Sequence, residues 1–81
     1  MRLPRDVSGA DLVKALRHIG YEETRQTGSH IRLSITKDGV HHLTVPAHDP
    51  IKLGTLAAII ADIALHRKVS KDQVVSLLFK Q

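Results

Sequence analysis

The sequence predicts an α+β fold, with one helix, a three-stranded antiparallel sheet and two further helices in chain order. Three observations lead to this prediction. Apolar residues recur at helical spacing over residues 12–19 and 56–63, they alternate with polar ones over residues 30–36, and turn-forming residues separate these segments. Because the apolar residues of the sheet fall on one face, we expect the first two helices to cover that face and the other face to stay open.

The first helix is expected to begin after Ser8, whose hydroxyl can cap the free N–H groups of the first turn. Asp11 then stands near the positive end of the helix, where a carboxylate is favourable. Gly20 is expected to end the helix in a left-handed conformation. The buried stripe should consist of Leu12, Val13, Leu16 and Ile19.

The most regular strand covers residues 30–36, with Ile, Leu and Ile on one face and His30 at the start of the other face. The preceding segment, residues 21–27, is polar and alternates weakly. We expect it to form an edge strand, because charges at a sheet edge prevent unwanted pairing. Gly28 and Ser29 form the turn between the two strands.

The third strand, residues 40–45, returns after a turn at residues 37–39. A two-residue loop would mix the two faces of this hairpin. A three-residue loop with a left-handed glycine pairs Leu33 with Leu43 and keeps the apolar face intact, so we expect that register. It places three side chains together on the open face: His30, Arg32 and His42.

Two helices are expected after the sheet. The second helix begins near Gly54, and its buried stripe should consist of Leu56, Ile59, Ile60 and Ile63. The third begins after Ser70, which forms a capping box with Gln73. Its apolar side should consist of Val74, Leu77 and Leu78.

Composition narrows the function. The 81 residues carry a net charge of +4 with a pI of about 9.9, which favours nucleic acid as a partner. With only Tyr21 and Phe79 as aromatic residues, base-stacking platforms are not expected, and RNA or DNA should be held mainly through phosphate and sugar. The absence of cysteine excludes disulfides and thiolate chemistry. Without a signal peptide or a membrane-spanning run, we expect residues 1–81 to form one cytoplasmic domain with no membrane partner.

A set of short motifs resembles the HicA-type (YcfA-like) mRNA interferase toxins in order and spacing. The motifs are Leu3-Pro4-Arg5 with Val7-Ser8-Gly9, Gly20-Tyr21, Arg25-Gln26, Gly28-Ser29-His30, Thr44-Val45-Pro46 with His48, and Gly54-Thr55-Leu56 with Ile59-Ile60. Gly-Ser-His alone recurs by chance, but Val-Pro-x-His and Gly-Thr-Leu at these spacings make the pattern specific. The chain departs from many members in a shorter loop over residues 46–54 and in a longer C-terminal segment, residues 62–81.

The resemblance implies a fold like that of a double-stranded-RNA-binding domain, α-β-β-β-α, to which this chain adds a C-terminal helix. It implies a translation-independent endoribonuclease that cleaves mRNA. It implies a HicB-type antitoxin protein as the partner that inhibits the toxin. It also implies that the histidine of the Gly-Ser-His motif, His30, is the catalytic residue.

The chemistry of RNA cleavage without a metal fits a histidine. The 2′-hydroxyl attacks its own phosphate, and the reaction needs a proton acceptor, a proton donor for the leaving 5′-oxygen, and positive charge near the phosphate. Histidine titrates close to neutral pH and suits both proton transfers, so we assign His30 as general base or acid.

Seven other residues are candidates for contact with the RNA phosphate: Gly28, Ser29, Arg32, His42, His48, Lys52 and Thr55. A glycine permits close backbone approach, an arginine supplies charge, and a helix start favours anions. Each also has an ordinary structural interpretation, as turn, solvated strand residue, loop cap or helix start. The second proton carrier stays open between His42 and His48.

No cofactor and no metal are expected, because the adjacent His41 and His42 point to opposite faces of a strand and cysteine is absent. His41 should face the apolar side near Ile35. Two other functions are alternatives: a non-catalytic RNA-binding module of the same fold, and a protein-interaction domain. RNA sequence specificity, oligomeric state, the antitoxin docking surface and the role of residues 62–81 stay open at this stage.

Overall fold

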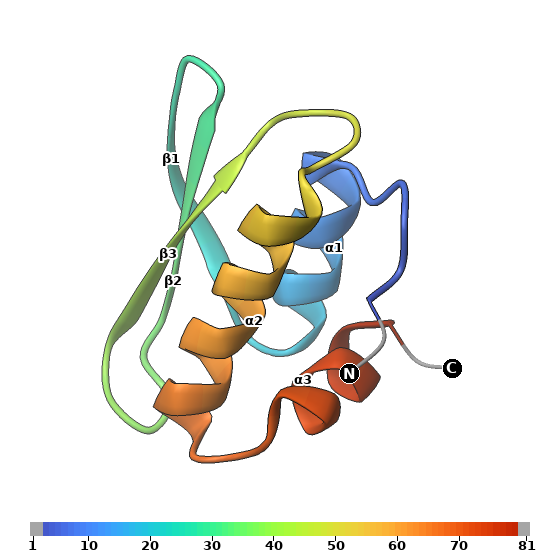
Figure 1. Ribbon diagram of the computed structural model, residues 1–81. Helices are drawn as coiled ribbons and strands as arrows, with labels where there is room; N and C mark the ends of the chain where they lie inside the picture. The colour runs from blue at the N-terminus through green and yellow to red at the C-terminus, as the bar shows by residue number, and fades with distance from the viewer. Residues whose placement is uncertain (1–2, 80–81) are drawn as a thin grey trace.

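The computed structural model describes residues 3–79, and its elements follow the predicted order (Figure 1). They are α1 (Gly9–His18), β1 (Glu22–Thr27), β2 (His30–Ile35), β3 (His41–Pro46), α2 (Leu53–Arg67) and α3 (Lys71–Phe79). The strands form one antiparallel sheet in the order β1-β2-β3, so the predicted α+β class is confirmed. Figure 1 shows α1 and α2 against one face of the sheet, with α3 beyond them and in contact with both helices.

The hairpin between β2 and β3 has the predicted register. Leu33 pairs with Leu43 and Ile31 with Val45, and all four side chains are buried. Gly39 adopts a φ of 97°, as the turn requires. Both strands therefore direct their apolar residues toward the helices.

The core lies between this face of the sheet and the helices. It includes the predicted stripes of α1 and α2, with Leu12, Leu16, Ile60 and Ile63 fully buried. Ile19, predicted to be buried at the end of α1, is half-buried and packs at the margin of the core.

The prediction for α3 is wrong at one residue. Its buried side consists of Val74, Val75 and Leu78, whereas Leu77 is 40% exposed. Val75 lies three residues before Leu78 and Leu77 three residues after Val74, so each extends the buried pair on one side and the apolar pattern could not distinguish them. Contact of α3 with both α1 and α2 selects Val75.

Helix starts differ along the chain. Ser8 caps α1, and Ser70 and Gln73 form a capping box at α3, as predicted. The structure adds that Asp11 accepts a hydrogen bond from the N–H of Ser8 and so completes a capping box at α1 as well. At α2 the residue in the cap position is Lys52, which makes no side-chain capping hydrogen bond. None of the helices within residues 3–79 combines the length and the apolar character that crossing a membrane would require.

A group of polar side chains ties the strands to α2 at the end of the sheet where β1 begins. Tyr21 is 1% exposed, and its hydroxyl lies 2.7 Å from Nδ1 of His41. Nε2 of His41 lies 3.2 Å from Oδ1 of Asp62 on α2, and the ring of His66 stacks on that of His41 at 4.5 Å. His41 thus faces the helices beside Ile35, as predicted.

Substituting Tyr21 by Phe tests this group. At pH 7 we expect the free energy of unfolding to fall by about 1 kcal/mol, because the hydrogen bond to His41 is lost while the ring stays in place. Denaturation in urea, with unfolding followed by circular dichroism, measures this change.

At high pH we expect the wild type to become less stable than the Phe variant. Burial raises the pKa of Tyr21 to about 12, with Arg67 acting in the opposite direction and Asp62 adding to the rise. The unfolded chain loses the phenolic proton near pH 10 and the folded chain near pH 12, so wild-type stability falls across this interval by up to about 2–3 kcal/mol. The Phe variant lacks this loss. Equal pH dependence in the two proteins would contradict the assignment.

Candidate functional site

The turn between β1 and β2 presents His30 to solvent. Thr27 pairs with His30, which leaves Gly28 and Ser29 as a two-residue loop, and Gly28 has a φ of 58°. A glycine with positive φ in the first loop position is typical of tight hairpins. Nothing lies within 4 Å of where a Cβ of Gly28 would stand. His30 is therefore the first residue of β2, exposed on the face that the helices leave open, as predicted.

The loop after β3 lies against this turn. His30 pairs with Pro46 across the sheet, and the backbone N–H of Ala47 donates a hydrogen bond of 2.6 Å to the carbonyl oxygen of Ser29. Two motifs separated in the sequence, Gly-Ser-His and Val-Pro-x-His, thus meet at one end of the sheet. His48, two residues beyond Pro46, is exposed at this end.

The start of α1 holds the same loop from the other side. The N–H of Gly9 donates to the carbonyl oxygen of His48 at 2.8 Å. A Cβ at Gly9 would overlap the carbonyl oxygen of Pro46 and would lie 2.9 Å from the Cα of Ala47. The absence of a side chain at Gly9 is what lets α1 approach this loop so closely.

The open face of the sheet consists of three rows of residues, one from each strand. The row at the turn holds Thr27, His30 and Pro46, the next holds Arg25, Arg32 and Thr44, and the last holds Glu22, Ser34 and His42. Arg32 is thus in the row beside His30, about 7 Å away along the strand. His42 shares the face, as predicted, but stands two rows from His30, about 13 Å along the strand.

The candidate histidines also differ in whether their rings are hydrogen-bonded. Nδ1 of His42 lies 2.6 Å from the hydroxyl oxygen of Ser34, which ties this ring to its own row. No side-chain hydrogen bond joins His30 or His48 to another of the described residues, 3–79. Both residues are exposed and stand at the same end of the sheet, whereas His42 stands two rows away from His30.

Lys52 and Thr55 lie at the start of α2, which Figure 1 shows at the same end of the molecule as the turn between β1 and β2. Lys52 is exposed and Thr55 is half-buried. Because no side chain caps this helix, its first N–H groups are available to an anion. One basic residue of the open face, Arg25, was missed by sequence reasoning because β1 alternates too weakly to reveal its orientation.

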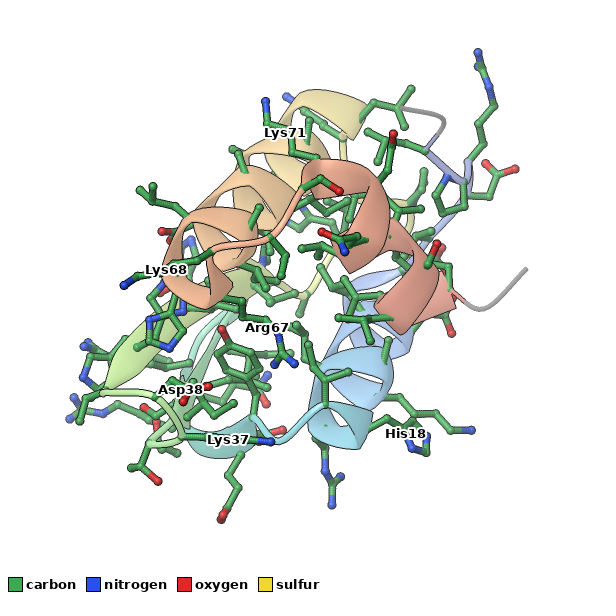
Figure 2. The ribbon with its side chains drawn as sticks, turned by 90° about the horizontal axis from the view of Figure 1, so that it is seen from below. His18, Lys37, Asp38, Arg67, Lys68 and Lys71 are labelled. Atoms are coloured by element: carbon green, nitrogen blue, oxygen red, sulfur yellow. The ribbon has the colours of Figure 1, made fainter. Side chains whose placement is uncertain are left out.

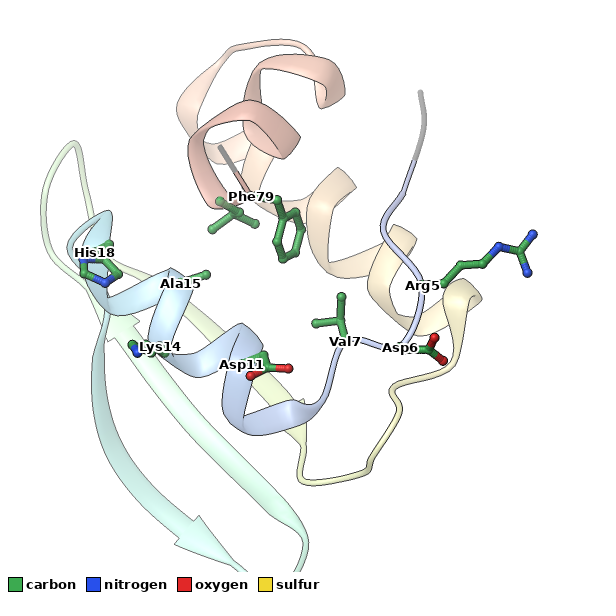
Figure 3. Close-up of a pocket in the computed structure, with 9 residues that line it drawn as sticks. Arg5, Asp6, Val7, Asp11, Lys14, Ala15, His18 and Phe79 are labelled. Carbon is green, nitrogen blue, oxygen red and sulfur yellow. The ribbon is translucent and has the colours of Figure 1, made fainter. Parts of the chain in front are cut away.

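Neither the basic residues nor the hollows of the surface are confined to the end of the sheet that carries the candidate site. Lys37, Arg67 and Lys68 stand at the opposite end, which Figure 2 views directly. A hollow of about 440 Å³ lies between α1 and α3, with Lys14 and Phe79 in its lining, and none of the candidate residues borders it (Figure 3). The candidate site is thus an open surface suited to an extended ligand rather than a cavity for a small one.

The residues at the Gly28–Ser29 turn can move a proton and bind an anion. An exposed imidazole, an arginine in the next row and a helix start without a side-chain cap are the features that phosphate chemistry uses. Within residues 3–79, no three His, Asp or Glu side chains gather closely enough to hold a metal ion.

Comparison with known proteins identifies one family. The family model described as "HicA toxin of bacterial toxin-antitoxin" matches residues 9–65, which include every candidate residue from Gly28 to Thr55. The segment before α1, with Leu3-Pro4-Arg5, and the whole of α3 lie outside the match. No curated protein and no solved structure matches the chain.

The close approach of α1 to the loop after β3 can be tested by substituting Gly9 by Ala. We expect a loss of about 1–3 kcal/mol in the free energy of unfolding, because the methyl group would displace the backbone at Pro46 and Ala47. Gly54, in the first turn of α2, is a matched control with open space around it. There Ala should be neutral or stabilise by up to about 1 kcal/mol, and equal effects in the two variants would contradict the prediction.

Proposed function

Because the chain belongs to the HicA family of bacterial toxins, it is the toxin of a toxin–antitoxin pair, and we propose that it acts as an endoribonuclease on mRNA. The observation that supports this proposal most is the exposed position of His30 on the open face, beside the Val-Pro-x-His loop. An open surface with basic residues suits a polymer substrate, because RNA can cross it without entering a pocket.

In the proposed reaction the RNA supplies its own nucleophile. The 2′-oxygen forms a bond to the adjacent phosphorus while the bond from phosphorus to the 5′-oxygen breaks, which leaves a 2′,3′-cyclic phosphate and a 5′-hydroxyl. His30 either accepts the proton of the 2′-hydroxyl or donates one to the departing 5′-oxygen. His48 is the candidate for the other transfer, because it is the histidine that shares the end of the sheet with His30.

The remaining candidate residues would hold the phosphate. Gly28 and Ser29 offer backbone without obstructing side chains, and Arg32 offers a guanidinium one row away. Lys52 and Thr55 flank the uncapped start of α2, where N–H groups point outward. His42 belongs to a more distant row and would contact RNA only along its path across the sheet.

The partner of the toxin is an antitoxin, and we propose an antitoxin of the HicB type that covers the open face around His30. We further propose that residues 1–81 act as one toxin domain. Inhibition would follow from exclusion of RNA, since His30 and Arg32 are exposed on a face that none of the helices within residues 3–79 covers.

Substituting His30 by Ala tests the catalytic assignment. Purified protein is incubated with mRNA in buffer containing EDTA, and cleavage is followed by mapping the ends of the fragments. We expect wild type to cleave and H30A to lose roughly 10²–10⁴-fold in rate, the usual contribution of a general acid or base. Growth of cells that express each variant, with and without its antitoxin, gives a second measurement.

His18 provides the matched control, because it is an exposed histidine on α1, away from the open face. H18A should cleave like wild type. Full activity of H30A would overturn the assignment of His30. Wild type that binds RNA but leaves it intact would instead identify a binding module, and tight antitoxin binding without RNA affinity at any salt concentration would identify a protein-interaction domain.

A further inference from the structure

We propose that Arg25 and Arg32 form a paired-arginine site for RNA phosphates next to the scissile one, and that a β-bulge in β1 creates this pair. The inference rests on the proposed ribonuclease function and extends it, since it assigns a contact for the substrate strand beyond His30. Its ligand is the phosphate backbone of a single RNA strand that crosses the open face of the sheet.

The bulge determines which way Arg25 faces. Glu23 pairs with Leu33, but Arg25 pairs with Arg32, so Thr24 is an additional residue in β1. Without it, Arg25 would stand opposite Ile31 and would share the face that α1 and α2 cover. One added residue reverses the alternation of the strand and places Arg25 on the open face.

Contacts within the sheet hold the bulge in place. The hydroxyl of Thr24 donates a hydrogen bond of 3.3 Å to the carbonyl oxygen of Arg32, the residue opposite. On the turn side of the bulge, Gln26 pairs with Ile31 and Thr27 with His30 without further irregularity. The register that aligns the two arginines is therefore the same register that positions His30.

The pair has no evident structural purpose. Like charges placed directly opposite each other on neighbouring strands destabilise a sheet. Both side chains are exposed, and neither guanidinium forms an ion pair with a carboxylate among residues 3–79. A bulge that costs regular pairing and brings two cations together is better explained by an anionic ligand than by stability.

The position of the pair fits an RNA strand that is cleaved at His30. The two arginines occupy the row next to His30, about 7 Å away, so long side chains from this row can reach phosphates on either side of the reacting one. The following row begins with Glu22, whose carboxylate repels phosphate. The arginines of this face are thus confined to the single row next to His30.

The test uses RNA that cannot be cleaved, so that binding is measured separately from catalysis. Single-stranded RNA of mixed sequence with 2′-O-methyl groups throughout is titrated with wild-type protein, R25Q, R32Q and the double variant over a range of salt concentrations. R17Q, on the exposed side of α1, is the matched control because it removes the same charge elsewhere. Thermal unfolding of each variant verifies that the fold is retained.

We expect R25Q and R32Q each to weaken binding roughly ten- to a hundredfold at low salt, as loss of a charged hydrogen bond does. The slope of log affinity against log salt should fall by about 0.7 for each arginine removed and stay near the wild-type value in R17Q. Cleavage of unmodified RNA should be slower in R25Q and R32Q, slowest in the double variant, and close to the wild-type rate in R17Q.

Equal behaviour of R25Q and R17Q would overturn the proposal. So would unchanged RNA binding by R25Q together with weaker binding of the antitoxin, which would assign Arg25 to the protein interface. The proposed function fails separately, if unmodified RNA stays intact with wild type. In that event a specific loss of RNA binding in R25Q and R32Q would still support the paired-arginine site.

Discussion

The register of β2 between its two neighbours is the constraint on which both the core and the candidate site depend. This central strand places Ile31, Leu33 and Ile35 under the helices, and the same alternation leaves His30 and Arg32 on the open face. A shift of one residue would bury the histidine and expose the apolar residues. Burial of three large aliphatic side chains therefore fixes the orientation of the candidate catalytic residue, although none of them lies on its face.

The sequence predicts the register of a strand well only where the two faces of that strand differ in hydrophobicity. In β2 and β3 one face is apolar, so the register, with Leu33 opposite Leu43, followed from the pattern. Every side chain of β1 is exposed, so nothing in its composition marks the bulge at Thr24 or the orientation of Arg25. Local patterns likewise identified the cap at Ser8 and the capping box of Ser70 and Gln73, whereas the choice of Val75 over Leu77 in α3 depends on contacts with two other helices.

The candidate site depends on long-range contacts that a pattern does not contain. The exposure of His30 was predictable, because it follows from alternation within one strand. The place of His48 was not, because two backbone hydrogen bonds, from Ala47 to Ser29 and from Gly9 to His48, hold the loop that carries it. Short motifs identify the residues that a family shares, but backbone contacts of this kind determine how close two motifs lie in the folded chain.

The partly buried polar contacts and the candidate site lie at opposite ends of the sheet. At one end the partly buried contacts of Tyr21, His41 and Asp62 join strands to α2, and at the other end a two-residue turn and a loop stay exposed. The open face between them lacks aromatic side chains, so an RNA strand bound there would gain little from base stacking. Contacts to phosphate are the same for every base, and recognition by this face would therefore depend on strand shape and charge more than on sequence. The proposed cleavage would then depend little on base sequence, and the proposed antitoxin would block it by covering this face.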